Sequence, residues 1–137
     1  ETLIKDCGLY KSKAKNLIAT CQILVDRYHG EVPRKFDQLV ELPGVGRKTA
    51  NVVVSVLFGT PAIAVDTHVF RVSNRLKLGI AKTPEEMEQK LQKAIPKKDW
   101  AAAHHWLIYH GRRLCKARKP LCDECFLNHV CPSAGKV

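Results

Sequence analysis

The chain has 137 residues, with 23 Lys and Arg against 13 Asp and Glu, so its formal charge at pH 7 is +10. Hydrophobic residues make up 45% of the sequence, which excludes a disordered or collagen-like chain and suffices for one or two small cores. No apolar run reaches the roughly 20 residues that a membrane span needs, and the surplus of positive charge favours a polyanionic partner such as nucleic acid.

The first predicted helix spans Ser12 to Tyr28. Its apolar residues recur every three or four positions, which is the pattern of an amphipathic helix with one face against a core. We expect Ser12 to be the N-cap and Gly30 to end the helix, because these residue types favour those positions.

Two further helices are expected before the middle of the chain. A short one follows Pro33 through Phe36, Leu39 and Val40, and it must end at Leu42, because the Pro43-Gly44 pair cannot continue a helix. Residues 47–58 carry apolar side chains on nearly every face, so we expect this helix to be buried. The clearest break in the pattern comes next, at residues 59–61, and it predicts a domain boundary near residue 60.

Three more helices are expected after this break. Asp66 stands at the N-cap of the first, the capping box at residues 83–86 opens the second, and the third runs from Asp99 or Trp100 to Cys115. The sequence after Cys115 is expected to be a loop, and no segment alternates with the period of a strand. The fold class is therefore all-α.

Residues 42–49, between the second and third helices, read Leu-Pro-Gly-Val-Gly-Arg-Lys-Thr. The glycines allow a tight turn, and the first amides of the next helix point outward at the positive end of its dipole. Such a helix start binds anions, for example a phosphate oxygen. The spacing is not that of a P-loop. The alternative is a helical hairpin with a glycine turn and no ligand.

Lys48 falls in the first turn of the 47–58 helix, where the helix dipole and neighbouring Arg47 disfavour an ammonium and favour a nucleophilic amine. Without a partner carboxylate, a phosphate contact or a solvated side chain is the simpler interpretation of this lysine. Asp66 is the candidate partner, because a residue that caps a helix can also face a cleft.

Four of the six cysteines, Cys115, Cys122, Cys125 and Cys131, form a C-x6-C-x2-C-x5-C pattern. Two disulfides are disfavoured, because nothing marks the chain as secreted. Structural zinc sites usually combine two C-x2-C pairs, and this pattern contains one. The spacing does not match the ferredoxin patterns either, so it leaves zinc and an iron–sulfur cluster open. Either metal would fold this segment.

The loop between the first two of these cysteines carries three cations, Lys116, Arg118 and Lys119. A solvated, charged loop is the simplest interpretation. If the metal holds both ends of the loop, however, the cations are presented rigidly to a phosphate backbone.

These motifs together resemble the endonuclease III branch of the helix-hairpin-helix DNA glycosylases. The resemblance rests on Leu-Pro-Gly-Val-Gly-Arg-Lys-Thr-Ala, Val-Asp-Thr-His-Val-Phe-Arg-Val and the four-cysteine pattern, in this order and at these separations. It implies the helix-hairpin-helix DNA glycosylase fold. A partial six-helix lobe would span residues 1–60, with the hairpin motif at about 30–58, and a helical iron–sulfur lobe would span 61–137, with the cluster loop at 115–131.

The same resemblance implies a bifunctional DNA glycosylase and abasic-site lyase that removes oxidised pyrimidines. The four cysteines would hold a [4Fe-4S] cluster, Lys48 would be the nucleophile, and Asp66 would stabilise the cationic sugar. β-elimination from a lysine Schiff base would then cut the strand. Leu9 would wedge into the gap left by the flipped base. The other implied DNA contacts are Gly44, Val45, Gly46, Arg47, Thr49, His68, Lys116, Arg118 and Lys119.

The implied partner is double-stranded DNA with damaged pyrimidines or abasic sites. The protein would be a monomer without membrane contact, in the cytoplasm and nucleoid of a prokaryote. The chain begins at Glu1, where the family is already several helices in, so we expect a piece of a longer protein with exposed apolar surface.

Two alternatives remain at this point. One is a non-catalytic DNA-binding module with a four-cysteine zinc site. The other is an adenine-removing relative, against which Lys48 and the Thr67-His68 pair argue, because that branch usually carries a non-nucleophilic residue at the lysine position.

Overall fold

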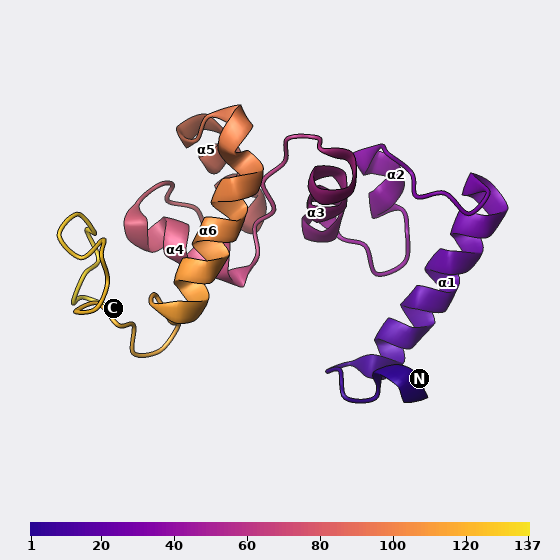
Figure 1. The fold of residues 1–137 in the computed structure, drawn as a ribbon, viewed down its shortest axis with the longest axis horizontal. Coiled ribbons are helices and arrows are strands. Elements are labelled where there is room, and N and C mark those ends of the chain that lie inside the picture. Colours follow the sequence, from indigo (N-terminus) through magenta and orange to yellow (C-terminus); the bar gives the residue numbers. More distant parts are fainter.

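The computed structural model describes all residues from 1 to 137, and it contains helices and loops but no strand. The all-α prediction is therefore confirmed. In chain order the elements are η1 (Thr2–Ile4), α1 (Tyr10–Tyr28), α2 (Phe36–Val40), α3 (Arg47–Phe58), α4 (Thr67–Leu76), α5 (Pro84–Ala94), η2 (Lys97–Asp99) and α6 (Trp100–Arg113). Figure 1 shows α1–α3 and α4–α6 as two groups, with the N-terminus and the C-terminal loop at opposite ends. None of these helices combines the length and hydropathy needed to cross a membrane.

The start of α1 differs from the prediction, whereas its end agrees. The helix begins at Tyr10, and Ser12 is not its N-cap. Leu9 stands at that position instead, in the left-handed conformation with φ of 58°, so a backbone turn and not a side-chain cap opens the helix. At the other end His29 and Gly30 both have positive φ, and the Gly30 amide donates to the Leu24 carbonyl at 2.9 Å. This is the glycine-assisted helix end that the sequence predicts.

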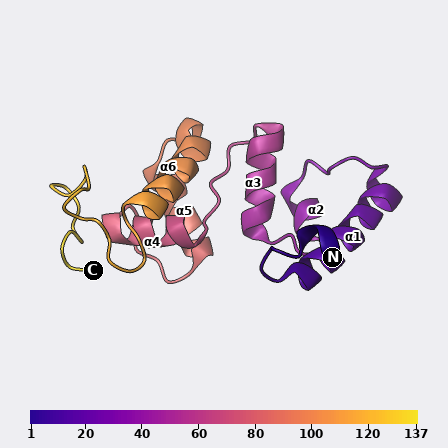
Figure 2. The same cartoon turned by 60° about the horizontal axis from the view of Figure 1, so that its bottom comes forward.

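Two separate groups of buried side chains hold the helices together. The hairpin core consists of Leu39, Leu42, Ala50, Val54 and Ala62. The α4–α6 core consists of Ile63, Val65, Val69, Val72, Met87, Leu91, Ala103 and Leu107. The chain passes from one core to the other between Ala62 and Ile63. The domain boundary near residue 60 stays a prediction. Figure 2 shows the same separation of α1–α3 from α4–α6 in a second view.

The prediction that residues 47–58 form a fully buried helix is wrong. α3 buries Ala50, Asn51 and Val54, but Val56 and Leu57 are 70% and 58% exposed. α2 is the only helix that packs extensively against α3, so much of the surface of α3 stays uncovered. On α1 the exposed fractions of Leu17, Ile18 and Val25 are also large, in agreement with the expected apolar surface.

α4 packs mainly against α6, and this contact fixes the start of α4. A Cβ atom on Gly111 of α6 would come within 3.0 Å of the His68 Cβ and 3.1 Å of the Val72 Cγ2. Glycine is therefore needed at position 111 for the two helices to approach this closely.

Candidate functional site

The hairpin between α2 and α3 forms a tight turn that α1 supports. Gly44 has φ of 76°, and a Cβ atom there would lie 2.6 Å from the Asn16 amide nitrogen. Thr20 on α1 donates a hydrogen bond to the Pro43 carbonyl at 2.9 Å. The N-cap of α3 is Gly46, which has no side chain to occupy the first amides of the helix. The predicted anion-binding helix start is thus available to a ligand.

Lys48 is exposed in the first turn of α3 and lines an open hollow of about 540 Å³. Three segments form this hollow, namely the start of α3, Val65 in the connection to α4, and the first half of α5. Because Val65 immediately precedes Asp66, the hollow brings the start of α3 toward the start of α4.

Asp66 is the N-cap of α4, as the sequence predicts. Its Oδ1 accepts hydrogen bonds from the amides of His68 and Val69, both at 2.8 Å. Its Oδ2 has no hydrogen-bond partner in the protein. The cap therefore fixes the orientation of the carboxylate and leaves Oδ2 free to interact with a ligand.

His104 of α6 is a buried histidine beside the segment that leads into Asp66, and sequence reasoning missed it. Its Nδ1 lies 2.7 Å from the Ala64 carbonyl oxygen. Burial lowers the pKa of His104, the Ala64 carbonyl opposes this shift, and the charges of Asp66 and Lys48 both act on the ring. No ion pair joins Lys48 to Asp66. Their assignment to one catalytic site stays a prediction.

Arg47 has a different environment from the one expected. Its guanidinium forms a two-point ion pair with Glu88 of α5, at 2.8 and 2.9 Å, and this hydrogen bonding raises the pKa of Arg47. The positive charge beside Lys48 is therefore paired with the negative charge of Glu88. Its role as a DNA contact stays a prediction.

Apart from the cations of the cysteine loop, the other predicted DNA contacts lie in three places. Leu9 is 81% exposed in the turn before α1. The hairpin residues Gly44, Val45 and Thr49 share a groove with Asn16 and Leu17 of α1. On α4, the Nδ1 of His68 lies 3.2 Å from an Arg71 guanidinium nitrogen, so this histidine is already engaged.

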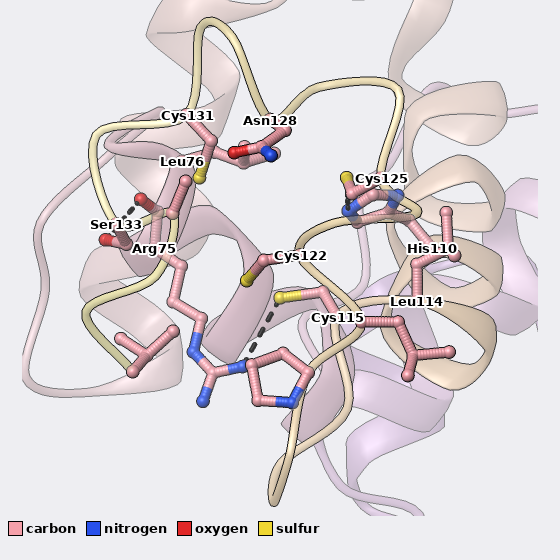
Figure 3. A pocket seen from close by; sticks show the side chains of 14 residues that line it. Arg75, Leu76, His110, Leu114, Cys115, Cys122, Cys125, Asn128, Cys131 and Ser133 are labelled. Carbon is pink, nitrogen blue, oxygen red and sulfur yellow. Dashed lines mark hydrogen bonds between the residues drawn. The ribbon is translucent and has the colours of Figure 1, made fainter.

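All four predicted ligand cysteines, Cys115, Cys122, Cys125 and Cys131, line a single cavity (Figure 3). None forms a disulfide. Apolar side chains such as Leu76, Leu114 and Leu121 complete the wall. Arg75 donates a hydrogen bond to the Cys115 sulfur at 3.3 Å.

The sulfur atoms face this cavity without converging on one point, and no three of them form a group that could ligate a single ion. A zinc ion needs four sulfurs around one centre, whereas each iron of a [4Fe-4S] cluster takes a different thiolate. The apolar cavity with separated thiols therefore fits the cluster better than zinc.

Two arginines of α4 hold the predicted DNA-binding loop by its backbone. Arg71 donates to the Cys115 carbonyl at 3.0 and 3.2 Å, and Arg75 donates to the Lys116 carbonyl at 2.7 Å and the Ala117 carbonyl at 3.2 Å. The loop is thus anchored by α4 as well as by its cysteines. The side chains of Lys116, Arg118 and Lys119 remain exposed, and none forms an ion pair.

Replacing Cys122 with Ser is expected to remove the metal centre. We expect the variant to lose its iron and its visible absorption, and residues 114–137 to become sensitive to protease, because metal binding folds such segments. Iron analysis, absorption spectra and limited proteolysis measure these effects. The exposed Cys21, replaced by Ser, is the control and should leave all three unchanged. A colourless, iron-free wild type that still needs Cys122 to fold would contradict the cluster and favour zinc.

The chain matches two known family patterns. Residues 1–97 match the HhH-GPD superfamily base excision DNA repair protein family, and residues 115–131 match the iron-sulfur binding domain of endonuclease III. The second match decides between the metals left open by the spacing. The four cysteines are ligands of a [4Fe-4S] cluster.

Several similar proteins are bacterial and carry the name endonuclease III. That of Rickettsia conorii is 57% identical over 128 residues, which cover 93% of this chain and 61% of the relative. That of Escherichia coli K12 is 52% identical over 137 residues, which cover 100% of this chain and 65% of the relative. The chain therefore spans a little over three fifths of the length of these relatives.

Solved structures give the same result. A non-covalent endonuclease III–DNA complex matches with a TM-score of 0.91 at 53% identity, covering 96% of this chain and 62% of that one. A thermostable thymine-DNA glycosylase matches with a TM-score of 0.84 at 28% identity, covering 98% of this chain and 64% of the glycosylase. With its helical hairpin and its iron–sulfur segment, the chain belongs to the HhH-GPD superfamily of base excision DNA repair proteins and, within it, to the endonuclease III family.

Proposed function

We propose that the protein containing this chain is a DNA glycosylase and abasic-site lyase that removes oxidised pyrimidines from duplex DNA. The observation that carries the proposal is that Lys48, at the start of α3, and Val65, the residue before Asp66, line the same hollow. The amine of Lys48 is exposed there, and the carboxylate of Asp66 is held in a fixed orientation just beyond Val65. A 54% identical relative has been trapped as a covalent endonuclease III–DNA intermediate, which supports covalent chemistry.

The proposed reaction begins with a nucleotide flipped out of the duplex. The Lys48 amine attacks the sugar C1′ while the bond from C1′ to the base breaks and the base leaves with the bonding electrons. Positive charge develops on the sugar, and the Asp66 carboxylate stabilises it. Because two amides already orient this carboxylate, it needs no reorganisation during the reaction.

The second half of the reaction uses the same lysine. Opening of the sugar ring gives a Schiff base between Lys48 and C1′, which acidifies the hydrogen on C2′. Loss of that proton and departure of the 3′ phosphate oxygen then break the strand by β-elimination. Hydrolysis of the Schiff base finally restores the amine. The attack on C1′ needs a lysine amine that can reach the sugar, which an exposed position in the first turn of α3 allows.

The DNA backbone would be held at two places. The uncapped start of α3 offers amides to one phosphate, and the exposed cations of the 115–122 loop approach others. Leu9, exposed in its turn, is the proposed wedge. When bound, the [4Fe-4S] cluster supplies a cross-link among the four cysteines, so this loop keeps its shape.

Borohydride trapping on duplex DNA with an abasic site tests the proposal. Reduction of the Schiff base should give a stable protein–DNA adduct, and mass spectrometry should locate it on the peptide that contains Lys48. DNA binding without any adduct would overturn the lyase and favour the non-catalytic module. Excision of adenine in preference to oxidised pyrimidines would overturn the substrate and favour the adenine-removing relative.

Changing the exposed loop cations is expected to weaken DNA binding through the salt-dependent part of the affinity. Lys119→Gln and Arg118→Gln should each lower the slope of log K against log salt by about one, because each removes one phosphate contact. Titrations of one duplex at several salt concentrations measure this slope. Lys93→Gln on α5 is the control, since this cation lies outside the loop. Equal slopes for wild type and both loop variants would contradict the role of the loop.

A further inference from the structure

Every hydrogen bond that joins residues 1–60 to residues 61–137 ends on one side chain, Glu88 of α5. Arg47 donates to its two carboxylate oxygens, Nε to Oε2 at 2.8 Å and a terminal nitrogen to Oε1 at 2.9 Å. Asn51, one turn further along α3, donates to Oε2 at 3.0 Å. No backbone hydrogen bond crosses between the two parts. A single carboxylate thus makes all the directional contacts between the two cores.

The carboxylate of Glu88 is buried, so its charge depends on its hydrogen-bond partners. Glu88 is only 5% exposed and stands between Met87 and Leu91, two side chains that are fully buried in the α4–α6 core. A buried charge is stable only when its partners are in place. The two-point contact with a guanidinium also fixes direction as well as distance. The Arg47 guanidinium also lies over the ring of Phe36, with its carbon 5.1 Å from the ring centroid.

The partners of Glu88 flank the proposed nucleophile. Arg47 immediately precedes Lys48, and Asn51 follows it by nearly one helical turn. Met87 and Leu91 of α5 pack in one core with Val69 and Val72 of α4, the helix that Asp66 caps. Any change in how Glu88 holds α3 therefore alters the position of Lys48 relative to Asp66.

We propose that Glu88 is a positioning residue, which sets the distance and orientation between Lys48 and Asp66 by holding Arg47 and Asn51. This inference rests on the proposed function, because it concerns the geometry of the same reaction. Glu88 does not touch the reacting atoms. Its removal should reduce the rate of the covalent steps, while the DNA-binding surfaces on the hairpin and the cysteine loop remain.

The test is Glu88→Gln, which keeps the size of the side chain but removes its charge. We expect the rate of borohydride-trapped adduct formation on abasic DNA under single-turnover conditions to fall by about 10- to 100-fold, since misplacement of a reacting group by about 1 Å has an effect of this size. The affinity for a duplex with an uncleavable abasic analogue should change little. Glu86→Gln, an exposed change on the same helix whose only side-chain bond is to the Lys82 amide, is the matched control and should react as wild type.

A double-mutant comparison separates positioning from direct DNA binding by Arg47. If Arg47 acts through Glu88, the rate of Arg47→Gln/Glu88→Gln should be close to that of Glu88→Gln alone, because contacting residues are not additive. If Glu88→Gln fails to fold, Arg47→Lys decides, since it keeps the charge but loses the two-point contact and should show a smaller loss of rate at unchanged affinity.

The possible failures are distinct. A wild type without adduct overturns the proposed function and, with it, this inference. A reactive wild type beside an equally reactive Glu88→Gln overturns only the positioning role. Fully additive effects of Arg47→Gln and Glu88→Gln also overturn it, because they would show two independent contributions.

Discussion

Lys48→Gln is expected to form no borohydride-trapped adduct with abasic DNA and to cut the abasic strand at least ~1,000-fold more slowly than wild type. Glutamine has a similar length and favours helix about as well as lysine, so α3 should form normally. Its amide nitrogen is not a nucleophile, so neither attack at C1′ nor Schiff-base formation can occur. Gel analysis of trapping and of strand cleavage under single-turnover conditions measures both losses.

Lys48→Arg separates the nucleophile from its charge. Arginine keeps a cation in the first turn of α3 but stays protonated and forms no Schiff base. We expect it to bind the duplex about as well as wild type and to be as inactive as Lys48→Gln. Substantial strand cleavage by the arginine variant would mean that Lys48 is a phosphate contact, which is the simpler interpretation of its sequence environment.

The helices could be predicted from the sequence where local signals define them. Asp66 and Thr83 both accept hydrogen bonds from amides of the helices they cap, and these contacts involve residues no more than three positions away. The start of α1 could not be predicted in this way, because it depends on the left-handed conformation of Leu9. The burial of α3 was also mispredicted, since it depends on which helices pack around it and not on its own apolar residues.

In the candidate site, too, residues in short motifs could be predicted, whereas contacts that depend on tertiary packing could not. Lys48 and the four cysteines lie within short motifs whose spacing carries the signal. Glu88 could not be linked to Arg47 from sequence, because 41 positions separate them and only the packing of α5 brings them together. The contacts of Arg71 and Arg75 with the cysteine loop are of the same kind, joining α4 to residues at least 40 positions away. A charged residue between two apolar core positions, such as Glu88 beside Met87 and Leu91, is the signal that could have indicated a buried partner.

Asp66 has two roles that two substitutions can separate. Asparagine is as good an N-cap as aspartate, so Asp66→Asn should keep the stability of wild type while losing the negative charge. We expect its rate of base excision to fall by about 100- to 1,000-fold, the effect of removing one group that stabilises developing charge in a transition state. Asp66→Ala should lose as much activity and, in addition, about 1 kcal/mol of stability, because the amides of His68 and Val69 lose their acceptor.

Comparing two substrates makes this prediction sharper. On DNA with a damaged base, the cationic sugar forms as the base leaves, so Asp66→Asn should be severely impaired. On DNA that already contains an abasic site, the sugar aldehyde is available to Lys48 without that step, so trapping should be impaired much less. Single-turnover rates on both substrates, with thermal unfolding of all three proteins, provide the measurements. Equal losses of rate on both substrates would mean that Asp66 acts mainly on Lys48 itself. Normal excision by Asp66→Asn, together with reduced stability of Asp66→Ala, would mean that Asp66 only caps α4.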